Sequence, residues 1–132
     1  MAVVDGEGNF VAATKMPAEE QRILEFLDGH SLGMSDTHAV LELVRSSPQM
    51  GVVSAFTFGR GYGGLRMALT AMCVDYTEVT PQKWQKFMGC RTGGDKNVSK
   101  DKAIELFPKV KVTHAIADAL LLAEYARRQR EG

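Results

Sequence analysis

The order of strand-like and helix-like segments constrains the fold of this chain more than any other feature. Short runs rich in apolar and β-branched residues, which are typical of strands, alternate with longer segments in which apolar residues recur every three or four positions. The strand-like segments are 1–16 (two strands around a tight turn at 5–9), 38–44 and 75–81. The helix-like segments are 17–29, 64–74, 81–89, 99–108 and 113–132. This β-β-α-β-α-β-α-α-α order predicts an α/β domain in which helices cover an at least partly parallel sheet.

Local signals set the expected ends of the helices. A proline, acids in the first turn and a glycine stop mark the first helix. The glycine-rich stretch 58–63 is expected to be a loop, with the next helix beginning at about Gly64. A Thr-Pro pair at 80–81 opens a short helix. Ser99 is expected to cap a helix that ends near Pro108.

Length and composition bound the class of protein. The chain has 132 residues, 45% of them hydrophobic and 24% charged, which suits one soluble domain over 1–132 with its own core. Cys73 and Cys90 match no metal-ligand spacing and suit a reducing, cytoplasmic setting better than a disulfide framework. The longest apolar run, at 116–126, is too short to cross a bilayer and contains two acids, so no membrane association is expected.

Charge is unevenly distributed along the chain. Residues 1–81 carry 10 acidic and 5 basic side chains, whereas residues 82–132 carry 6 acidic and 11 basic ones. One interpretation is solvated helix faces, and the other is a basic surface for a polyanion beside an acidic site. The lysines that would hold phosphates in the second case are Lys83, Lys86, Lys96, Lys100 and Lys102.

Two acids lie in apolar surroundings. Glu42 interrupts the strand-like run 38–44, and Asp118 lies in the first turns of the last helix. A buried carboxylate needs a counter-ion, a metal or a hydrogen-bond network. Two such acids could converge on Mg²⁺, which prefers a few carboxylates together with waters and substrate phosphates. Alternatively, Glu42 forms a structural ion pair, and Asp118 is an exposed acid near a helix N-terminus; the arginines available to Glu42 are Arg45, Arg60 and Arg66.

His114 precedes Asp118 by four residues, so both lie on one face of the same helix. It could ligate a metal or carry a proton. The alternative is a helix-start residue in polar contact with the backbone.

Four blocks of sequence resemble the RuvC-like Holliday junction resolvases, in particular the branch found in phages, bacteria and chloroplasts. They are "GVVSAFTFGRGYGGLRMAL" at 51–69, "VTPQKWQKFMG" at 79–89, "SKDKAIELFP" at 99–108 and "HAIADALLLAEYARRQ" at 114–129, in the family's order. The resemblance implies a ribonuclease H-like fold, a mixed five-stranded sheet flanked by helices. It also implies Mg²⁺- or Mn²⁺-dependent cleavage of branched DNA by a homodimer, in the cytoplasm of a bacterial or phage-infected cell.

The resemblance also assigns roles to individual residues. Glu42 matches the family's acid on the central strand, Asp118 its last catalytic aspartate, and His114 a position where relatives carry Asp or His. Lys100 lies in a block that resembles the basic stretch beside the scissile phosphate. Arg60 lies in "FGRGYG", which resembles the segment leading into a DNA-contacting helix. Trp84 could stack on a base, although an indole in this context is more often a core anchor.

The chain departs from the family at its N-terminal side. The family begins with a strand that carries the first catalytic aspartate in a pattern like "GIDPGxxG", and nothing here matches it. The start at "MAVVDGEGN" resembles the second strand and its turn, so we expect a ribonuclease H-like domain that lacks its N-terminal strand. The expected causes are a start assigned too late, a fragment, or an inactive relative that still binds nucleic acid. A protein that binds another phosphate ligand is a further alternative. For the homodimer, the stripe of Met67, Leu69 and Met72 is either the interface or core.

Overall fold

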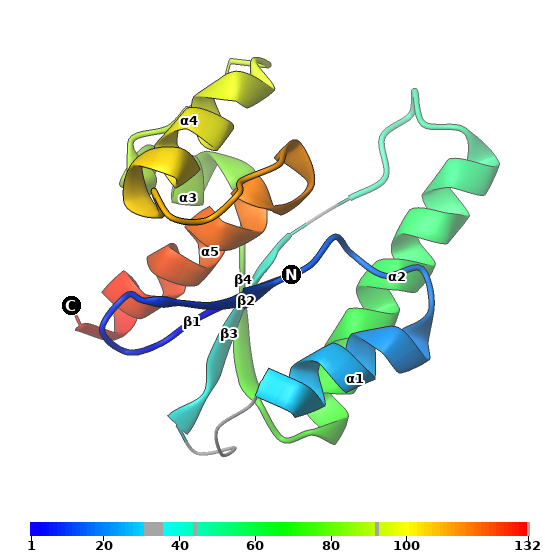
Figure 1. Ribbon diagram of the computed structural model, residues 1–132. Coiled ribbons are helices and arrows are strands. Elements are labelled where there is room, and N and C mark those ends of the chain that lie inside the picture. Colours follow the sequence, from blue (N-terminus) through cyan, green and yellow to red (C-terminus); the bar gives the residue numbers. More distant parts are fainter. Residues whose placement is uncertain (31–35, 44, 92, 132) are drawn as a thin grey trace.

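The computed structural model describes residues 1–30, 36–43, 45–91 and 93–131 (Figure 1). The elements follow the expected order: β1 (Ala2–Val4), β2 (Phe10–Ala13), α1 (Glu20–His30), β3 (His38–Glu42), α2 (Val52–Ala71), β4 (Asp75–Val79), α3 (Pro81–Met88), α4 (Lys96–Leu106) and α5 (His114–Glu131). The prediction of an α/β chain with strands alternating with helices is therefore confirmed.

The strands form two pairs. β1 and β2 are antiparallel, and β3 and β4 are parallel with His38 opposite Asp75 and Glu42 opposite Val79. The parallel pair needs a crossover connection, which α2 supplies. Helix α5 packs against both β1 and β3, so one helix spans the two pairs.

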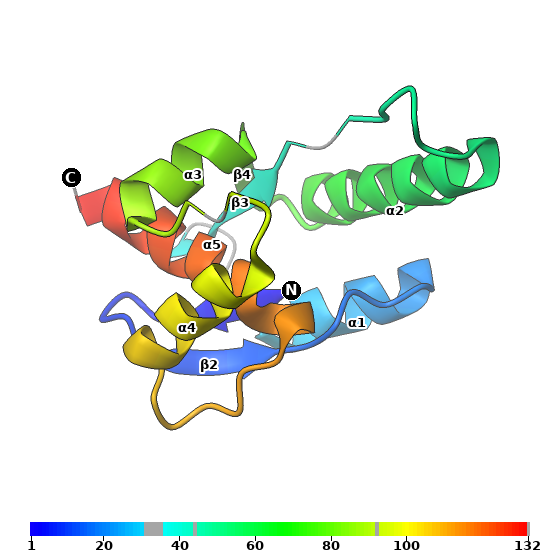
Figure 2. The same cartoon turned by 90° about the horizontal axis from the view of Figure 1, so that it is seen from above.

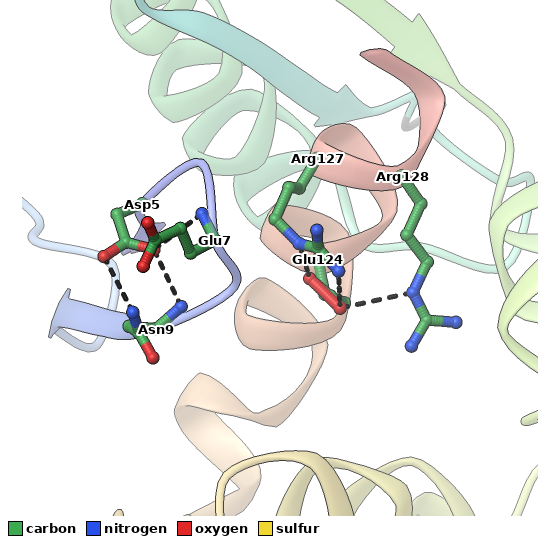
Figure 3. Close-up of polar contacts among 6 residues, drawn as sticks. All are labelled: Asp5, Glu7, Asn9, Glu124, Arg127 and Arg128. Carbon is green, nitrogen blue, oxygen red and sulfur yellow. Dashed lines mark hydrogen bonds and ion pairs between the residues drawn. The ribbon is translucent and has the colours of Figure 1, made fainter. Parts of the chain in front are cut away.

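The turn between β1 and β2 is held by a carboxylate. One oxygen of Asp5 accepts hydrogen bonds from the backbone N–H groups of Glu7 and Asn9, each over 2.9 Å, and the other accepts from the Asn9 amide at 3.1 Å (Figure 3). Gly8 has a φ of 89°, a conformation in which a side chain would be strained. Asp5 therefore has a local structural role in this turn.

The helices lie on two sides of the strands. Figure 1 shows α1 and α2 on one side and α3, α4 and α5 on the other. The larger core cluster lies on the α3–α5 side and is built around Trp84, Leu120 and Leu121, all 0% exposed. The smaller cluster contains Leu41 and Leu69 and includes side chains of α1 and α2.

The alternation of side chains along β3 decides where Glu42 points. Leu41 belongs to the smaller core cluster, whereas Val40 packs against the larger one. Successive strand residues face opposite sides of a sheet, so Glu42 shares the side of Val40, toward α3 and α5. Val44, the last residue of the predicted strand, lies outside the described residues.

Two predicted helix starts are wrong. Helix α2 begins at Val52, so the glycine-rich stretch expected to be a loop is helical. Glycine weakens a helix without forbidding it, and here the flanking residues and packing against α1 and β4 outweigh that weakness. Helix α4 begins at Lys96, capped by the Asp95 side chain, which accepts from the Asn97 N–H at 2.9 Å. Ser99 lies inside this helix and is buried, so it is not the cap.

The remaining boundaries are close to those expected. Helix α1 begins at Glu20, three residues after Pro17. Thr80 caps α3 as predicted, accepting from the Lys83 N–H at 3.3 Å, and the helix ends at a left-handed Gly89.

Candidate active site

Glu42 lies at the carboxyl end of β3, and its neighbour in space is an indole. Trp84, on α3, is completely buried and donates a hydrogen bond from Nε1 to Oε2 of Glu42 over 2.7 Å. Helix α3 starts directly after β4, whose last residue Val79 lies opposite Glu42 in the parallel pair. The parallel pairing therefore brings the first turn of α3 beside the Glu42 carboxylate.

The alternative of an arginine counter-ion for Glu42 does not match the observed pairs, because no ion pair among the described residues joins Glu42 to Arg45, Arg60 or Arg66. Nε of Arg60 lies 3.6 Å from Glu20, and Nε of Arg66 lies 3.9 Å from Glu78. The half-buried Glu42 carboxylate is instead stabilised by a neutral donor. This contact also decides between the alternatives for Trp84, because a side chain with no exposed surface cannot stack on a DNA base.

Glu42 and Asp118 lie close enough for their charges to interact. Burial raises the pKa of Glu42, the Trp84 hydrogen bond lowers it and the Asp118 charge raises it, with a net rise. Asp118 itself is exposed on α5, one turn after His114, so the expectation that its apolar sequence neighbours bury it is wrong and the alternative of an exposed helix acid is what the structure shows. The structure thus places Glu42 at the carboxyl end of the parallel strands, with the charge of Asp118, 76 residues later on α5, acting on its carboxyl group. Ligand sites in open α/β sheets are typically at such an edge.

Cys90 was not identified as a neighbour of the site from the sequence. It is 1% exposed and follows the end of α3. Burial and the Asp118 charge raise the pKa of its thiol, whereas the Lys102 charge lowers it. Lys102 on α4 therefore lies on the same side of the molecule as Asp118. Cys90 directly follows Gly89, which ends α3, and nothing in the sequence around it indicates that it lies near Asp118 and Lys102.

His114 is the first residue of α5, and its Nε2 lies 3.0 Å from Oδ1 of Asn97 on α4. Its polar contact is thus with an amide side chain rather than with the backbone. Because Oδ1 can only accept, the ring donates to it when Nε2 carries the proton. His114 and Asp118 share a helix face, as the four-residue spacing predicts.

The six basic side chains expected to contact DNA fall into two groups. Five lysines belong to α3 and α4, the helices that pack against α5 (Figure 2). Lys83, Lys86 and Lys96 are exposed, and Lys100 and Lys102 are half-buried. Arg60 is remote from them on α2, in the layer on the other side of the strands, where it pairs with Glu20.

The carboxylates of Glu42 and Asp118 could supply some, but not all, of the ligands of a hard divalent cation. Glu42 and Asp118 offer carboxylate oxygens, the ligands that Mg²⁺ and Mn²⁺ prefer. Within the described ranges, no cluster of three or more His, Cys, Asp or Glu side chains is arranged to hold a metal. These two acids would leave most coordination positions to water and to substrate oxygens. None of the helices that the structure describes is long and apolar enough to cross a membrane.

Comparison with known proteins identifies the fold. No protein-family model matches the sequence, and no curated protein matches it. Among solved structures, the chain is similar to Thermus thermophilus RuvC (TM-score 0.63, 18% identity, 92% of this chain and 75% of that one). It is also similar to T. thermophilus RuvC in complex with a Holliday junction substrate (TM-score 0.63, 17% identity). That alignment covers 86% of this chain and 66% of the RuvC chain, so this chain spans about two-thirds of its length. The chain therefore has the ribonuclease H-like fold of RuvC, with helices flanking a mixed set of parallel and antiparallel strands.

Proposed function

We propose that this protein is a metal-dependent endonuclease that cleaves Holliday junctions or other branched DNA, acting as a homodimer in the cytoplasm of a bacterial or phage-infected cell. The observation that carries the proposal is the half-buried Glu42 carboxylate, held by Trp84 at the carboxyl end of the parallel strands and acted on by the charge of Asp118. The fold shared with RuvC supports the same function.

The side chains of the site would divide the chemistry between them. Glu42 and Asp118 would hold Mg²⁺ or Mn²⁺, with His114 as a further ligand or a proton carrier. A cation bound there supplies charge neutralisation at the scissile phosphate and activates water for in-line attack. Trp84 fixes one oxygen of Glu42 by its 2.7 Å hydrogen bond and leaves the other free to act as a ligand.

The lysines on α3 and α4 would bind the DNA backbone. Their charges lie in the same layer as Asp118, so phosphates drawn to them pass near the two carboxylates. Lys100 and Lys102 are two residues apart on a helix and so point in different directions. Of these two, Lys102 lies closer to the candidate site, since its charge and that of Asp118 both act on the pKa of the Cys90 thiol. We retain Lys100 as a candidate contact to the scissile phosphate and Arg60 as a peripheral DNA contact.

A second candidate function is nucleic-acid binding without cleavage on the same fold. It is favoured by the absence, among the described residues, of any group of three or more His, Cys, Asp or Glu side chains arranged to hold a metal. Both functions need the lysines on α3 and α4, but only cleavage needs Glu42 and Asp118.

The test is cleavage of a synthetic four-way junction in Mg²⁺, with a linear duplex of the same sequence beside it. The variants are Glu42→Gln and Asp118→Asn, with Glu25→Gln, an exposed acid on α1, as the matched control. Junction cutting that survives in the control and falls at least about a thousandfold in the site variants supports the nuclease. Junction binding without cutting by the unmodified protein supports the second candidate. Equal binding of junction and duplex, with no cutting, contradicts both the structure selectivity and the nuclease.

A further inference from the structure

Helices α4 and α5 are joined by a contact between two polar side chains. Asn97 is the second residue of α4, and His114 is the first residue of α5. Nε2 of the His114 ring lies 3.0 Å from Oδ1 of the Asn97 amide, although 17 residues separate the two along the chain. Both side chains are exposed, so neither fills the core. The contact therefore needs a reason other than packing.

The hydrogen bond to Asn97 sets the orientation of the His114 ring. An exposed side chain at the start of a helix rotates about its torsions unless a contact holds it. Among the residues that the structure describes, the Asn97 amide is the one hydrogen-bond partner of this ring. Because α4 packs against α5, the amide stays within reach of the ring. The direction of the imidazole is thus decided by α4, and not by α5, which carries it.

Asn97 is itself fixed by the start of α4. Its backbone N–H donates a hydrogen bond of 2.9 Å to Oδ1 of Asp95, which caps the helix. The next residue, Val98, packs against the larger core cluster. A helix start that is both capped and anchored in the core presents its side chains from a backbone that moves little. The Asn97 amide is therefore a fixed reference point for the His114 ring.

The contact distinguishes the two nitrogens of the ring. An amide oxygen can only accept a hydrogen bond, and a neutral imidazole carries its single proton on either Nδ1 or Nε2. A proton on Nε2 makes the 3.0 Å contact a hydrogen bond, whereas a lone pair there would face the lone pairs of Oδ1. The contact thus favours the Nε2–H form, in which Nδ1 is the only nitrogen with a free lone pair. In that form only Nδ1 can bind a cation or accept a proton.

We propose that Asn97 is a positioning residue of the candidate active site, which holds the neutral His114 ring with its proton on Nε2 so that Nδ1 is the nitrogen that acts there. This inference rests on the proposed function, because it assigns an atom to the role of ligand or proton carrier given to His114. Functional histidines commonly donate their second ring N–H to a fixed acceptor, which sets both tautomer and orientation. Here the acceptor is an amide on a neighbouring helix. Because His114 and Asp118 share a face of α5, a ring held in this way is also held relative to the acid one turn later.

The first test identifies the tautomer of His114 directly and does not depend on cleavage. The full chain is labelled with nitrogen-15 in its histidines, freed of metal with a chelator and studied by NMR at about pH 8.5, where neutral imidazole predominates. The signals that are missing from His114→Gln belong to His114. In the unmodified protein, Nε2 should show the chemical shift of a protonated nitrogen and Nδ1 that of an unprotonated one. In Asn97→Ala the two shifts should move toward each other, because the ring then exchanges between tautomers. Asn97→Asp, which keeps an acceptor oxygen at the same reach, should restore the Nε2–H form.

The second test measures whether this tautomer matters for the chemistry. Asn97→Ala should cut a four-way junction roughly tenfold more slowly than the unmodified protein and bind the junction with the same Kd. Gln21→Ala is the matched control. Gln21 is likewise the second residue of an 11-residue helix, is exposed, and has an amide with a side-chain partner, Glu25. This variant should change neither the cutting rate nor the shifts of His114.

Three results overturn the inference: a proton on Nδ1 of His114 in the unmodified protein, unchanged shifts in Asn97→Ala, or cutting by Asn97→Ala at the full rate. A fixed Nε2–H form in an unmodified protein that cuts no junction has a different meaning. It would contradict the proposed function and leave the assignment of the tautomer standing.

Discussion

Nε1 of Trp84 lies 2.7 Å from Oε2 of Glu42, and this hydrogen bond joins two side chains that are 42 residues apart in the sequence. It connects the first turn of α3 to the end of β3. The indole is part of the larger core cluster and is completely buried, so it can shift little. The contact therefore holds the Glu42 carboxylate in one orientation while most of its surroundings are apolar.

Replacing Trp84 by Phe tests this positioning role. The variant keeps an aromatic ring in the core but removes the only N–H of the side chain. We expect the cleavage rate to fall by about tenfold, the usual effect of losing a residue that orients a metal ligand. Because the Trp84 hydrogen bond lowers the pKa of Glu42, its loss should move the acid limb of the pH–rate profile to higher pH. The measurement is the cleavage rate of a four-way junction from pH 5 to 9.

A structural effect of Trp84→Phe alone would not move this limb. Phe87→Leu on the same helix serves as the control, because Phe87 is 50% exposed and its ring contacts Tyr125. An acid limb that stays in place in Trp84→Phe would show that the hydrogen bond does not act on the ionisation that limits cleavage.

Glu42→Gln should stabilise the fold while it abolishes cleavage. Burial and the nearby Asp118 charge raise the pKa of Glu42 despite the Trp84 hydrogen bond, so ionised Glu42 disfavours the folded state. This penalty is absent below the unfolded-state pKa and grows as the pH rises above it. We expect a gain on the order of 1 kcal/mol at pH 8, as is common when a carboxylate kept for function is replaced. Thermal unfolding in the presence of a chelator, at pH 8 and pH 4, checks both the gain and its disappearance in acid.

The lysines of α3 should govern the salt dependence of DNA binding. Lys83 and Lys86 are three residues apart, exposed, and on one face of the helix. The double variant Lys83→Ala, Lys86→Ala should reduce the slope of log Kd against log salt by about 2, one for each phosphate that the variant no longer neutralises. Lys15→Ala, which removes an exposed lysine on the chain after β2, is the control and should leave the slope unchanged. Equal slopes in all three proteins would place the DNA elsewhere.

Glu124 should control the stability of the C-terminal part of α5 in acid. It is 5% exposed and is held by two arginines, with 2.5 and 2.9 Å hydrogen bonds from Arg127 and one of 3.2 Å from Arg128 (Figure 3). Burial raises the pKa of this carboxyl, but the hydrogen bonds and charges of the arginines outweigh burial and lower it. Its stabilising effect is therefore present above the unfolded-state pKa and is lost as the pH falls through the lower folded-state value.

Glu124→Gln should consequently lower the free energy of unfolding by about 2 kcal/mol at pH 7, the range for hydrogen bonds to a charged group. The difference from the unmodified protein should disappear near pH 2. Urea unfolding at several pH values measures both. Glu105→Gln is the comparison, since Glu105 is exposed, pairs with Lys102 across 3.6 Å and should change stability by less than about 1 kcal/mol. A Glu124→Gln effect that is the same at all pH values would mean that shape, and not charge, matters there.

The sequence by itself determined the type and order of the elements, because these depend on signals within a few residues. Thr80 caps α3 and Asp5 holds the β1–β2 turn through contacts with their own neighbours. The alternation of apolar residues with a period of two predicts strands, and their recurrence with a period of 3.6 predicts helices. The sequence also identified Glu42 as an acid that needs a partner, because a carboxylate inside a buried strand is costly. The same reasoning failed for Asp118, which is exposed on α5 although its sequence neighbours are apolar.

Only the tertiary structure decided what each of these residues meets. The glycine-rich start of α2 is helical because packing on α1 and β4 overrides a weak local propensity. Trp84 became a hydrogen-bond donor to Glu42 because parallel pairing of β3 and β4 brings α3 to that edge. Such contacts join residues that are dozens of positions apart, and their energy comes from burial and geometry that no local pattern encodes. The same holds for the stripe of Met67, Leu69 and Met72: Leu69 is buried in the smaller core cluster and Met72 packs against it, so these two are core, whereas Met67 is 64% exposed.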